Sequence, residues 1–310
     1  MGSEYISLFD NKDSKGFSIT VEDLAITTVQ QEVKDLLDLA ELPVNRISEA
    51  IELTPIPGYS LRELVLRCIT RKAYESMLAI LDLVRLCHSL PAMSLLRSMC
   101  EELIFAKFIK TLPSEDAEAF LKEKTMFELL KSQFAQAEYF LTKAAVSTSE
   151  KNTKKKPLEE LKVLRGKLVA VPKQKLVELG EKLGWGKTDS PSIRYMAEQT
   201  GGLEIYNFFY HAASSSVHAN LHNLLRMVWG NPEKGRFSIT NMNYERYYRK
   251  VVIAYGATLF SEIMETAKDS FPDMWEGVDY EAYREKVAFI IRYTPPIVTQ
   301  EELNWRGPQS

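Results

Sequence analysis

Apolar residues recur every three or four positions over long stretches of this chain, which is the period of an amphipathic α-helix. The 14 glycines and 13 prolines fall mainly between these stretches. No run of alternating apolar and polar residues is long enough to build a sheet. The pattern therefore predicts an all-α fold, a multi-helix up-and-down bundle with no significant β-sheet.

Capping residues and prolines mark the expected ends of the helices. Ser60, with Glu63 three positions later, predicts a capping box at the start of a helix that runs to about His88. Two short helices are expected within residues 20–53, the second beginning at Pro43. The remaining helices are predicted over residues 92–111, 115–146, 158–171, 173–185, 193–202, 203–229, 244–270 and 280–293.

The same pattern divides the chain into three segments. Residues 1–58 form an N-terminal helical extension, residues 59–293 form the helical bundle, and residues 294–310 form a polar C-terminal tail. Within the bundle, the stretch STSEKNTKKK contains no apolar residue and ends in a lysine run before a proline. We therefore expect a mobile basic loop at about residues 147–157.

Composition excludes several classes of protein. The 39 basic and 42 acidic residues leave a net charge of −3, so the charge of the whole chain predicts neither a nucleic-acid nor a membrane partner. The chain has no apolar run long enough to span a bilayer and begins without a secretory signal, which predicts a cytoplasmic protein. Cys68, Cys87 and Cys100 form no CxxC pair and are expected to be reduced core residues.

The helix predicted over residues 203–229 carries an unusual polar stripe. An apolar seam that includes Tyr210 runs along it at helical spacing, and a second stripe lies about 100° away. This second stripe contains three of the four histidines of the chain. Its members, with the neighbouring Ser214, are His211, Ser215, His218, His222 and Arg226.

A matching feature lies on the helix predicted over residues 92–111. Arg97 lies within its apolar face with Glu101 beside it, one turn further along, so the two side chains can pair. A charge that leaves water must find a partner, and the candidates here are this neighbour and the polar stripe of another helix. If the two helices pack side by side, they create a cluster of Arg, Glu, Ser and His inside the bundle.

The stretches LPAMSLLRSMCEELIFAKFI and GWGKTDSPSIRYMAEQTGGLEIYNFFYHAASSSVHANL resemble the hallmark regions of a bacterial all-helical domain-of-unknown-function family. Their motifs are R-x3-E on one helix and Y-x3-S-x3-H on another, and the similarity covers about residues 60–270. The resemblance implies that Arg97, Glu101, Ser214 and His218 are the polar positions of the family, with Tyr210 preceding them. It also implies a link with helical ribonucleases and bacterial defence or stress proteins, although the arginine and histidine motif of those ribonucleases is absent.

Three interpretations of the cluster stay open at this stage. In the first, the protein is a non-catalytic interaction or regulatory module, which favours a protein partner or a homo-oligomer, and the cluster fixes helix register or forms a ligand pocket. In the second, it is a nuclease-like or phosphoryl-transfer enzyme acting on RNA or a nucleotide, with His218 as general acid/base, Arg97 holding phosphate and Glu101 orienting one of them. The third is a metal held by His218 and His222, although the glutamate of the HExxH motif is missing and no cofactor is predicted.

A local basic segment bears on the choice of partner. Residues 151–175 contain nine basic residues against two acidic ones, including Lys154, Lys155 and Lys156. Such a segment can attract nucleic acid, but it contains no aromatic residue on which a base could stack. A solvated lysine-rich loop and helix face is the alternative interpretation.

Overall fold

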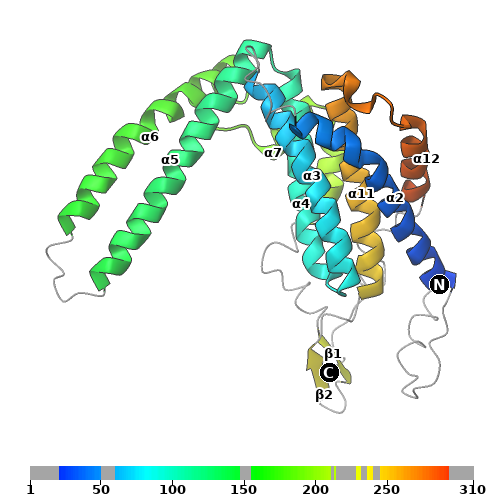
Figure 1. Cartoon of the computed structure of the whole chain (residues 1–310). Coiled ribbons are helices and arrows are strands. Elements are labelled where there is room, and N and C mark those ends of the chain that lie inside the picture. The colour runs from blue at the N-terminus through cyan, green and yellow to red at the C-terminus, as the bar shows by residue number, and fades with distance from the viewer. Residues whose placement is uncertain are drawn as a thin grey trace. The chain divides into compact units, whose positions relative to one another are not determined.

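The computed structural model describes residues 21–49, 60–146, 155–210, 213, 228–231, 236–239 and 245–292. Most of these residues are helical, and the helices pack against one another, which confirms the predicted all-α fold (Figure 1). The helices are α2 (Val21–Glu49), α3 (Leu61–Arg85), α4 (Ser89–Thr111), α5 (Ser114–Val146), α6 (Lys155–Leu183), α7 (Ile193–Gln199), α8 (Leu203–Ile205), α11 (Glu245–Ser270) and α12 (Tyr280–Ile291). A π-helical turn, η1 (Tyr206–Tyr210), and a 3-10 turn, η3 (Pro272–Trp275), join them.

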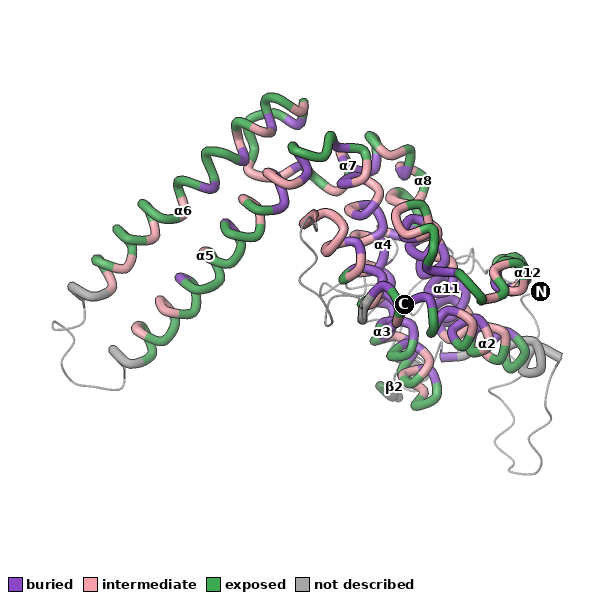
Figure 2. Tube along the Cα trace, turned by 45° about the horizontal axis from the view of Figure 1, so that its top comes forward, coloured by how far each residue is buried: buried purple, intermediate pink, exposed green. Residues whose placement is uncertain are grey.

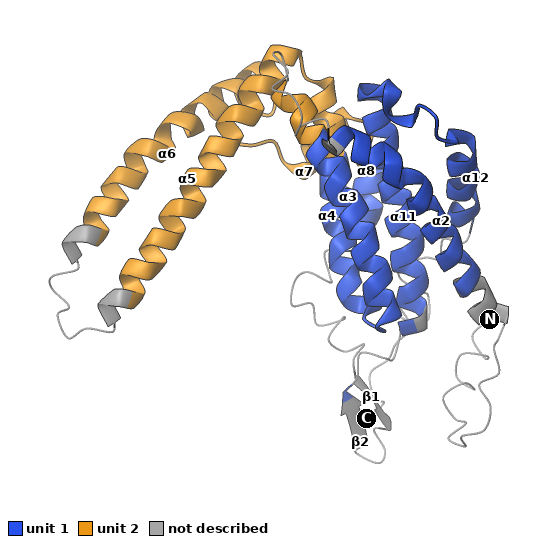
Figure 3. Cartoon of the chain, viewed as in Figure 1, with its two compact units in different colours: residues 1–55, 67–103, 204–310 blue, residues 56–66, 104–203 orange. Residues whose placement is uncertain are grey.

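The chain forms two compact units, each built from segments that are separate in sequence (Figure 3). Unit 1 contains residues 1–55, 67–103 and 204–310, and unit 2 contains residues 56–66 and 104–203. Unit 1 therefore includes α2, α11 and α12, whereas unit 2 includes α5, α6 and α7.

The core of unit 1 lies along α11, whose middle turns are almost completely buried. Gly256 allows a close approach here, because a Cβ atom at this position would lie 2.7 Å from Met77 Sδ on α3. Helix α12 packs against α2, and Lys286 Nζ lies 2.9 Å from a Glu32 carboxylate oxygen. Trp275 adds an aromatic contact, with its ring centroid 4.7 Å from that of Tyr283.

Aromatic side chains also organise unit 2. Trp185 packs edge-on against Phe120 and Phe108, with ring centroids 5.4 and 6.1 Å apart. Along α5, Phe120, Phe127 and Phe134 are all buried at intervals of seven residues, and this spacing places them on the face that contacts α6.

The start of α3 confirms the predicted Ser60 cap and adds a tertiary contact to it. The backbone N–H of Glu63 donates to Ser60 Oγ at 3.1 Å. The N–H groups of Leu61 and Arg62 donate to the two carboxylate oxygens of Glu118 on α5, at 2.8 and 3.0 Å. Two separate caps thus satisfy the first three amide groups of α3, which have no partner inside the helix.

Two predicted helix breaks are wrong, because each proline concerned lies inside a continuous helix. Helix α2 runs through Pro43, and α6 runs through Pro172. A proline removes one helical hydrogen bond, but buried residues continue the same apolar face on both sides of Pro43 in α2. Helix α6 also begins at Lys155, inside the predicted loop 147–157, and residues 147–154 lie outside the described part of the chain.

The end of the helix predicted over residues 203–229 needs a correction as well. Val228–Asn231 forms a strand, β1, which pairs antiparallel with β2 (Arg236–Ile239). Val228 lies opposite Ile239 in this two-stranded ribbon, which is the one sheet among the described residues. Pro232 favours an extended conformation at Asn231, and this local signal opposes helix.

The three cysteines lie in different environments, against the expectation that all are core residues. Cys100 is buried, Cys87 is partly exposed and Cys68 is exposed. All three are free thiols.

Candidate functional site

The polar cluster begins with two residues on α4. Arg97 Nε donates to Glu101 Oε1 at 2.9 Å, so the two side chains form the ion pair that their spacing of four predicts. The Arg97 side chain is 17% exposed and that of Glu101 is 35% exposed. The pair therefore lies at the boundary between the core of unit 1 and solvent, where water screens it only in part.

Tyr210 holds the other side of the guanidinium. Arg97 Nη2 donates to the Tyr210 hydroxyl at 3.1 Å, and the guanidinium carbon lies 4.8 Å from the centroid of the same ring. Arg97 thus makes both a hydrogen bond and a cation–π contact with one side chain. The contact joins α4 to the segment that follows α8.

The backbone that presents Tyr210 is a single π-helical turn, Tyr206–Tyr210. The rings of Tyr206 and Tyr210 stack at a centroid distance of 4.7 Å, with an angle of 21° between their planes. Phe209 points into the core, where its ring meets that of Tyr255 at 5.0 Å. Single π turns within helices are rare and occur frequently at functional sites.

The charge of Arg97 is well supported by its surroundings. The hydrogen bond that Arg97 donates to Glu101 raises the pKa of Arg97, the negative charge on this carboxylate adds to that effect, and burial opposes it. The guanidinium therefore stays positive, and a carboxylate and an aromatic ring offset the cost of its partial burial.

The remaining predicted site residues fall outside what the structure describes. This holds for His211, Ser214, Ser215, His218, His222, Arg226 and Lys154. Lys155 and Lys156 lie in the first turn of α6, but their side chains are not among those described. The structure thus brings Arg97, Glu101 and Tyr210 together, and the roles assigned to the histidines and lysines stay predictions.

Sequence patterns missed a second polar cluster, at the N-terminal end of α4. The carboxylate of Glu245 accepts hydrogen bonds from the Ser89 backbone N–H, at 3.2 and 3.3 Å, and from the Ser89 hydroxyl. Both residues are buried, and the carboxylate lies where a helix terminus favours negative charge. Because the two residues are 156 positions apart, no local pattern could reveal this contact.

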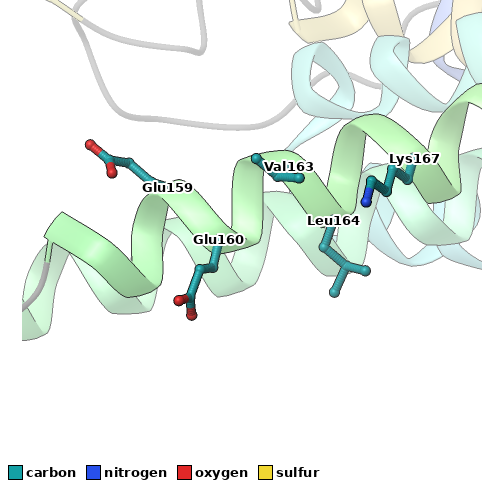
Figure 4. Close-up of a pocket in the computed structure, with 5 residues that line it drawn as sticks. All are labelled: Glu159, Glu160, Val163, Leu164 and Lys167. Carbon is teal, nitrogen blue, oxygen red and sulfur yellow. The ribbon is translucent and has the colours of Figure 1, made fainter.

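No metal centre emerges from the described residues. No group of three or more His, Cys, Asp and Glu side chains is placed to hold a metal ion in this part of the chain. A depression on the surface of α6 is lined by Glu159, Glu160, Val163, Leu164 and Lys167 (Figure 4). All five lining residues belong to one helix, so the depression offers little enclosure to a small ligand.

The described helices also bear on membrane association. None of them combines the length and the apolar composition that crossing a lipid bilayer requires.

The fold and the cluster together define a class of protein: an all-helical protein in which an arginine, a glutamate and a tyrosine connect two helical segments. Within that class, the chain belongs to the Family of unknown function (DUF5677), whose model matches residues 63–236. The match runs from Glu63, near the start of α3, through β1 to Arg236, the first residue of β2, so it contains the whole Arg97 cluster. Searches of curated proteins and of solved structures each found no match to this chain.

Proposed function

We propose that this protein is a helical interaction or regulatory module in which Arg97, Glu101 and Tyr210 form a structural network. The observation that carries the proposal is that side chains of the same chain occupy both sides of the Arg97 guanidinium. Glu101 accepts a hydrogen bond from Arg97 Nε, and the Tyr210 hydroxyl accepts one from Nη2. The Tyr210 ring also makes a cation–π contact with the guanidinium group. These contacts suit an arginine that fixes how two helical segments pack.

A catalytic arginine that holds phosphate would instead direct its paired donors towards an open substrate site. Here the contacts join α4 to the π turn, and the Tyr206 ring stacks on the Tyr210 ring. The resemblance to helical defence proteins supports a role in a bacterial defence or stress response, carried out in the cytoplasm through contacts with other proteins.

The test of this proposal is a pair of conservative variants. Tyr210→Phe removes the hydroxyl and keeps the ring, whereas Arg97→Lys keeps the charge and removes the planar donor group. We expect each to lower the free energy of unfolding by about 1–2 kcal/mol, measured by urea denaturation.

Tyr139→Phe is the matched control for the hydroxyl, because Tyr139 is 54% exposed and its hydroxyl can be solvated by water. This control should unfold like the original protein, within about 0.5 kcal/mol. Equal stability of the Tyr210→Phe and Arg97→Lys variants with the original protein would contradict a structural role for the network.

One contact favours a second candidate function, a nuclease-like or phosphoryl-transfer enzyme. The Arg97–Tyr210 hydrogen bond sets Arg97 beside the residue that immediately precedes the segment carrying Ser214 and His218. In this proposal His218 acts as general acid/base and Arg97 binds phosphate. Glu101 orients either the His218 or the Arg97 side chain, and Lys154–Lys156 attract nucleic acid.

Assays of RNA and nucleotide hydrolysis separate the two functions. The enzyme proposal predicts turnover that His218→Ala abolishes without unfolding the protein. Absence of turnover in the original protein, or equal turnover in the His218→Ala variant, would contradict it.

A further inference from the structure

Helices α5 and α6 form an antiparallel hairpin in unit 2, closed by ion pairs along its length. Lys182 pairs with Asp116 near one end, and Arg165 Nη1 lies 3.3 Å from Glu138 Oε2 towards the other. Between them, Lys175 Nζ lies 2.8 Å from Glu123 Oε1. These contacts define a seam, the line along which the two helices face each other.

The hairpin exposes much apolar surface outside this seam, and Figure 2 shows both helices exposed over most of their length. Eight large apolar residues of α5 and α6 are between 45% and 65% exposed. This number is larger than the number of exposed large apolar residues in the rest of the described chain. They are Met126, Leu129, Tyr139, Phe140, Val163, Leu164, Leu168 and Val171.

Most of these residues gather on one side of the hairpin. On α5, Met126 comes one position before the buried Phe127, and Phe140 comes one position before Leu141, which continues the seven-residue spacing of the face towards α6. On α6, Leu164 comes one position before the ion-paired Arg165. In the same way, Leu168 comes before Val169 and Val171 comes before the buried Pro172. In two antiparallel helices that face each other, residues one position before the seam point to the same side, because a residue turns 100° in a right-handed helix.

We call these five residues the hairpin face: Met126, Phe140, Leu164, Leu168 and Val171. It extends over about 21 Å, the rise of an α-helix from residue 126 to residue 140. The opposite side, one position after the seam, carries mainly small or polar residues, although Tyr139 also lies there after Glu138. The small and polar residues are Glu128, Ala135, Lys162, Gly166 and Lys173. Five of the eight exposed apolar residues therefore share one side of the hairpin, as on a helix pair that lacks a partner.

We propose that the partner of the hairpin face is a second copy of this chain, and that two hairpins pack face to face as an antiparallel four-helix bundle. This inference rests on the proposed interaction role, and it names the partner. Charge complementarity supports it, because α6 contains eight basic and four acidic residues, whereas α5 contains six acidic and four basic residues. A two-fold axis parallel to the helices sets α6 of each copy against α5 of the other, so that helices of opposite net charge lie next to each other.

The size of the surface agrees with a stable dimer. With 33 and 29 residues, the helices are about 50 and 44 Å long, and over the shorter length two helices about 10 Å wide give roughly 900 Å² per copy. Stable protein interfaces bury about 800 Å² per partner. The hairpin face supplies the apolar centre of this area and the charged residues supply its polar border.

The experiment is to measure the molar mass of the full chain by size-exclusion chromatography with light scattering, over a hundredfold range of concentration. We expect a dimer with twice the 35.4 kDa mass of the chain. The Leu164→Glu/Leu168→Glu double variant should have a dissociation constant about a hundredfold weaker or more, and therefore run as a monomer. Leu164→Met/Leu168→Met should stay a dimer, because methionine conserves volume and apolar character.

Leu42→Glu/Leu78→Glu is the matched control, since these leucines are 48% and 42% exposed and lie in unit 1. It should remain a dimer. A monomeric original protein, a dimeric Leu164→Glu/Leu168→Glu variant, or a monomeric control would each overturn the proposal. Circular dichroism checks that the variants are folded, and Leu164→Gln/Leu168→Gln replaces the glutamate variant if that one unfolds. The Arg97→Lys and Tyr210→Phe experiments measure the free energy of unfolding, whereas this experiment measures molar mass. A failure of the proposed dimer can therefore be distinguished from a failure of the proposed structural network.

Discussion

At the scale of single residues, the Cys100 thiol is set apart by its burial on α4. Its side chain has no exposed surface, and burial raises its pKa to about 12, with a smaller contribution from the Glu101 charge. The folded state therefore holds the thiol proton at pH values where the unfolded chain has released it. Stability from this group is complete below the pKa of the unfolded thiol, near 9, and is lost as the pH rises towards 12.

We expect this effect to appear in alkaline unfolding experiments. Between pH 8 and pH 10.5, Cys100 should lower the free energy of unfolding by about 2 kcal/mol, because each unit of pH beyond the pKa of the unfolded thiol costs about 1.4 kcal/mol. Urea denaturation at both pH values measures the loss, and Cys100→Ala should reduce it. Cys68→Ala is the control, since Cys68 is exposed and its replacement should leave the dependence on pH unchanged. An identical pH dependence in all three proteins would contradict the assignment.

At the scale of elements, α3 depends on a carboxylate from another helix. Glu118 accepts from two amide groups at the start of α3, and these charged hydrogen bonds also suit the positive end of the helix dipole. Glu118→Ala should therefore lower the free energy of unfolding by about 1–2 kcal/mol. Glu128→Ala is the comparison on the same helix, because it removes only the exposed ion pair with Lys124 and should cost less than about 0.5 kcal/mol. If Glu118→Ala and Glu128→Ala lower the free energy of unfolding equally in chemical denaturation, the cap stabilises the protein no more than an ordinary surface charge does.

Local signals in the sequence account for most helix ends. Ser60, Pro113 and Asp279 each act within a few residues of the helix they begin or end, and Asp279 Oδ1 accepts from the Ala282 N–H at 2.9 Å. The continuous helices through Pro43 and Pro172 were not predictable in this way. A local rule assigns a proline to a break, whereas packing over the whole length of the helix decides the outcome.

In the candidate site, too, the sequence predicts the local contact and misses the contacts that depend on tertiary packing. The spacing of four predicts the Arg97–Glu101 pair, because helix geometry alone brings these side chains together. The Tyr210 hydroxyl lies 113 positions from Arg97 along the chain. The family resemblance singles out Tyr210 as the residue that precedes the polar positions, but its contact with Arg97 depends on tertiary packing and on a π turn that no sequence rule indicates. Glu245, buried against Ser89, was missed for the same reason.

At the scale of the whole molecule, the two units differ in how much they bury. Residues 158–171 of α6 include no buried side chain, whereas nearly every residue from 251 to 264 of α11 is buried. Helical amides exchange hydrogen through local opening, which costs less where fewer apolar contacts must be broken. In the monomeric Leu164→Glu/Leu168→Glu variant, we therefore expect residues 158–171 to exchange much faster than residues 251–264, as measured by mass spectrometry.

The same measurement connects to the proposed dimer. Packing of the hairpin face should slow exchange at residues 158–171, and the Leu164→Glu/Leu168→Glu variant should lose this protection while α11 keeps its own. Slow exchange in α6 that persists in a monomeric variant would show that something other than a second copy protects the helix.

The aromatic clusters give each unit a separate optical signal. Trp185 is buried among Phe108 and Phe120 in unit 2, and Trp275 is buried among Tyr280 and Tyr283 in unit 1. An indole that passes from such an apolar setting into water shifts its fluorescence emission to longer wavelength. With Trp229 and Trp305 replaced by phenylalanine, and with either Trp275 or Trp185 replaced as well, two single-tryptophan proteins would show whether the units open together or one before the other.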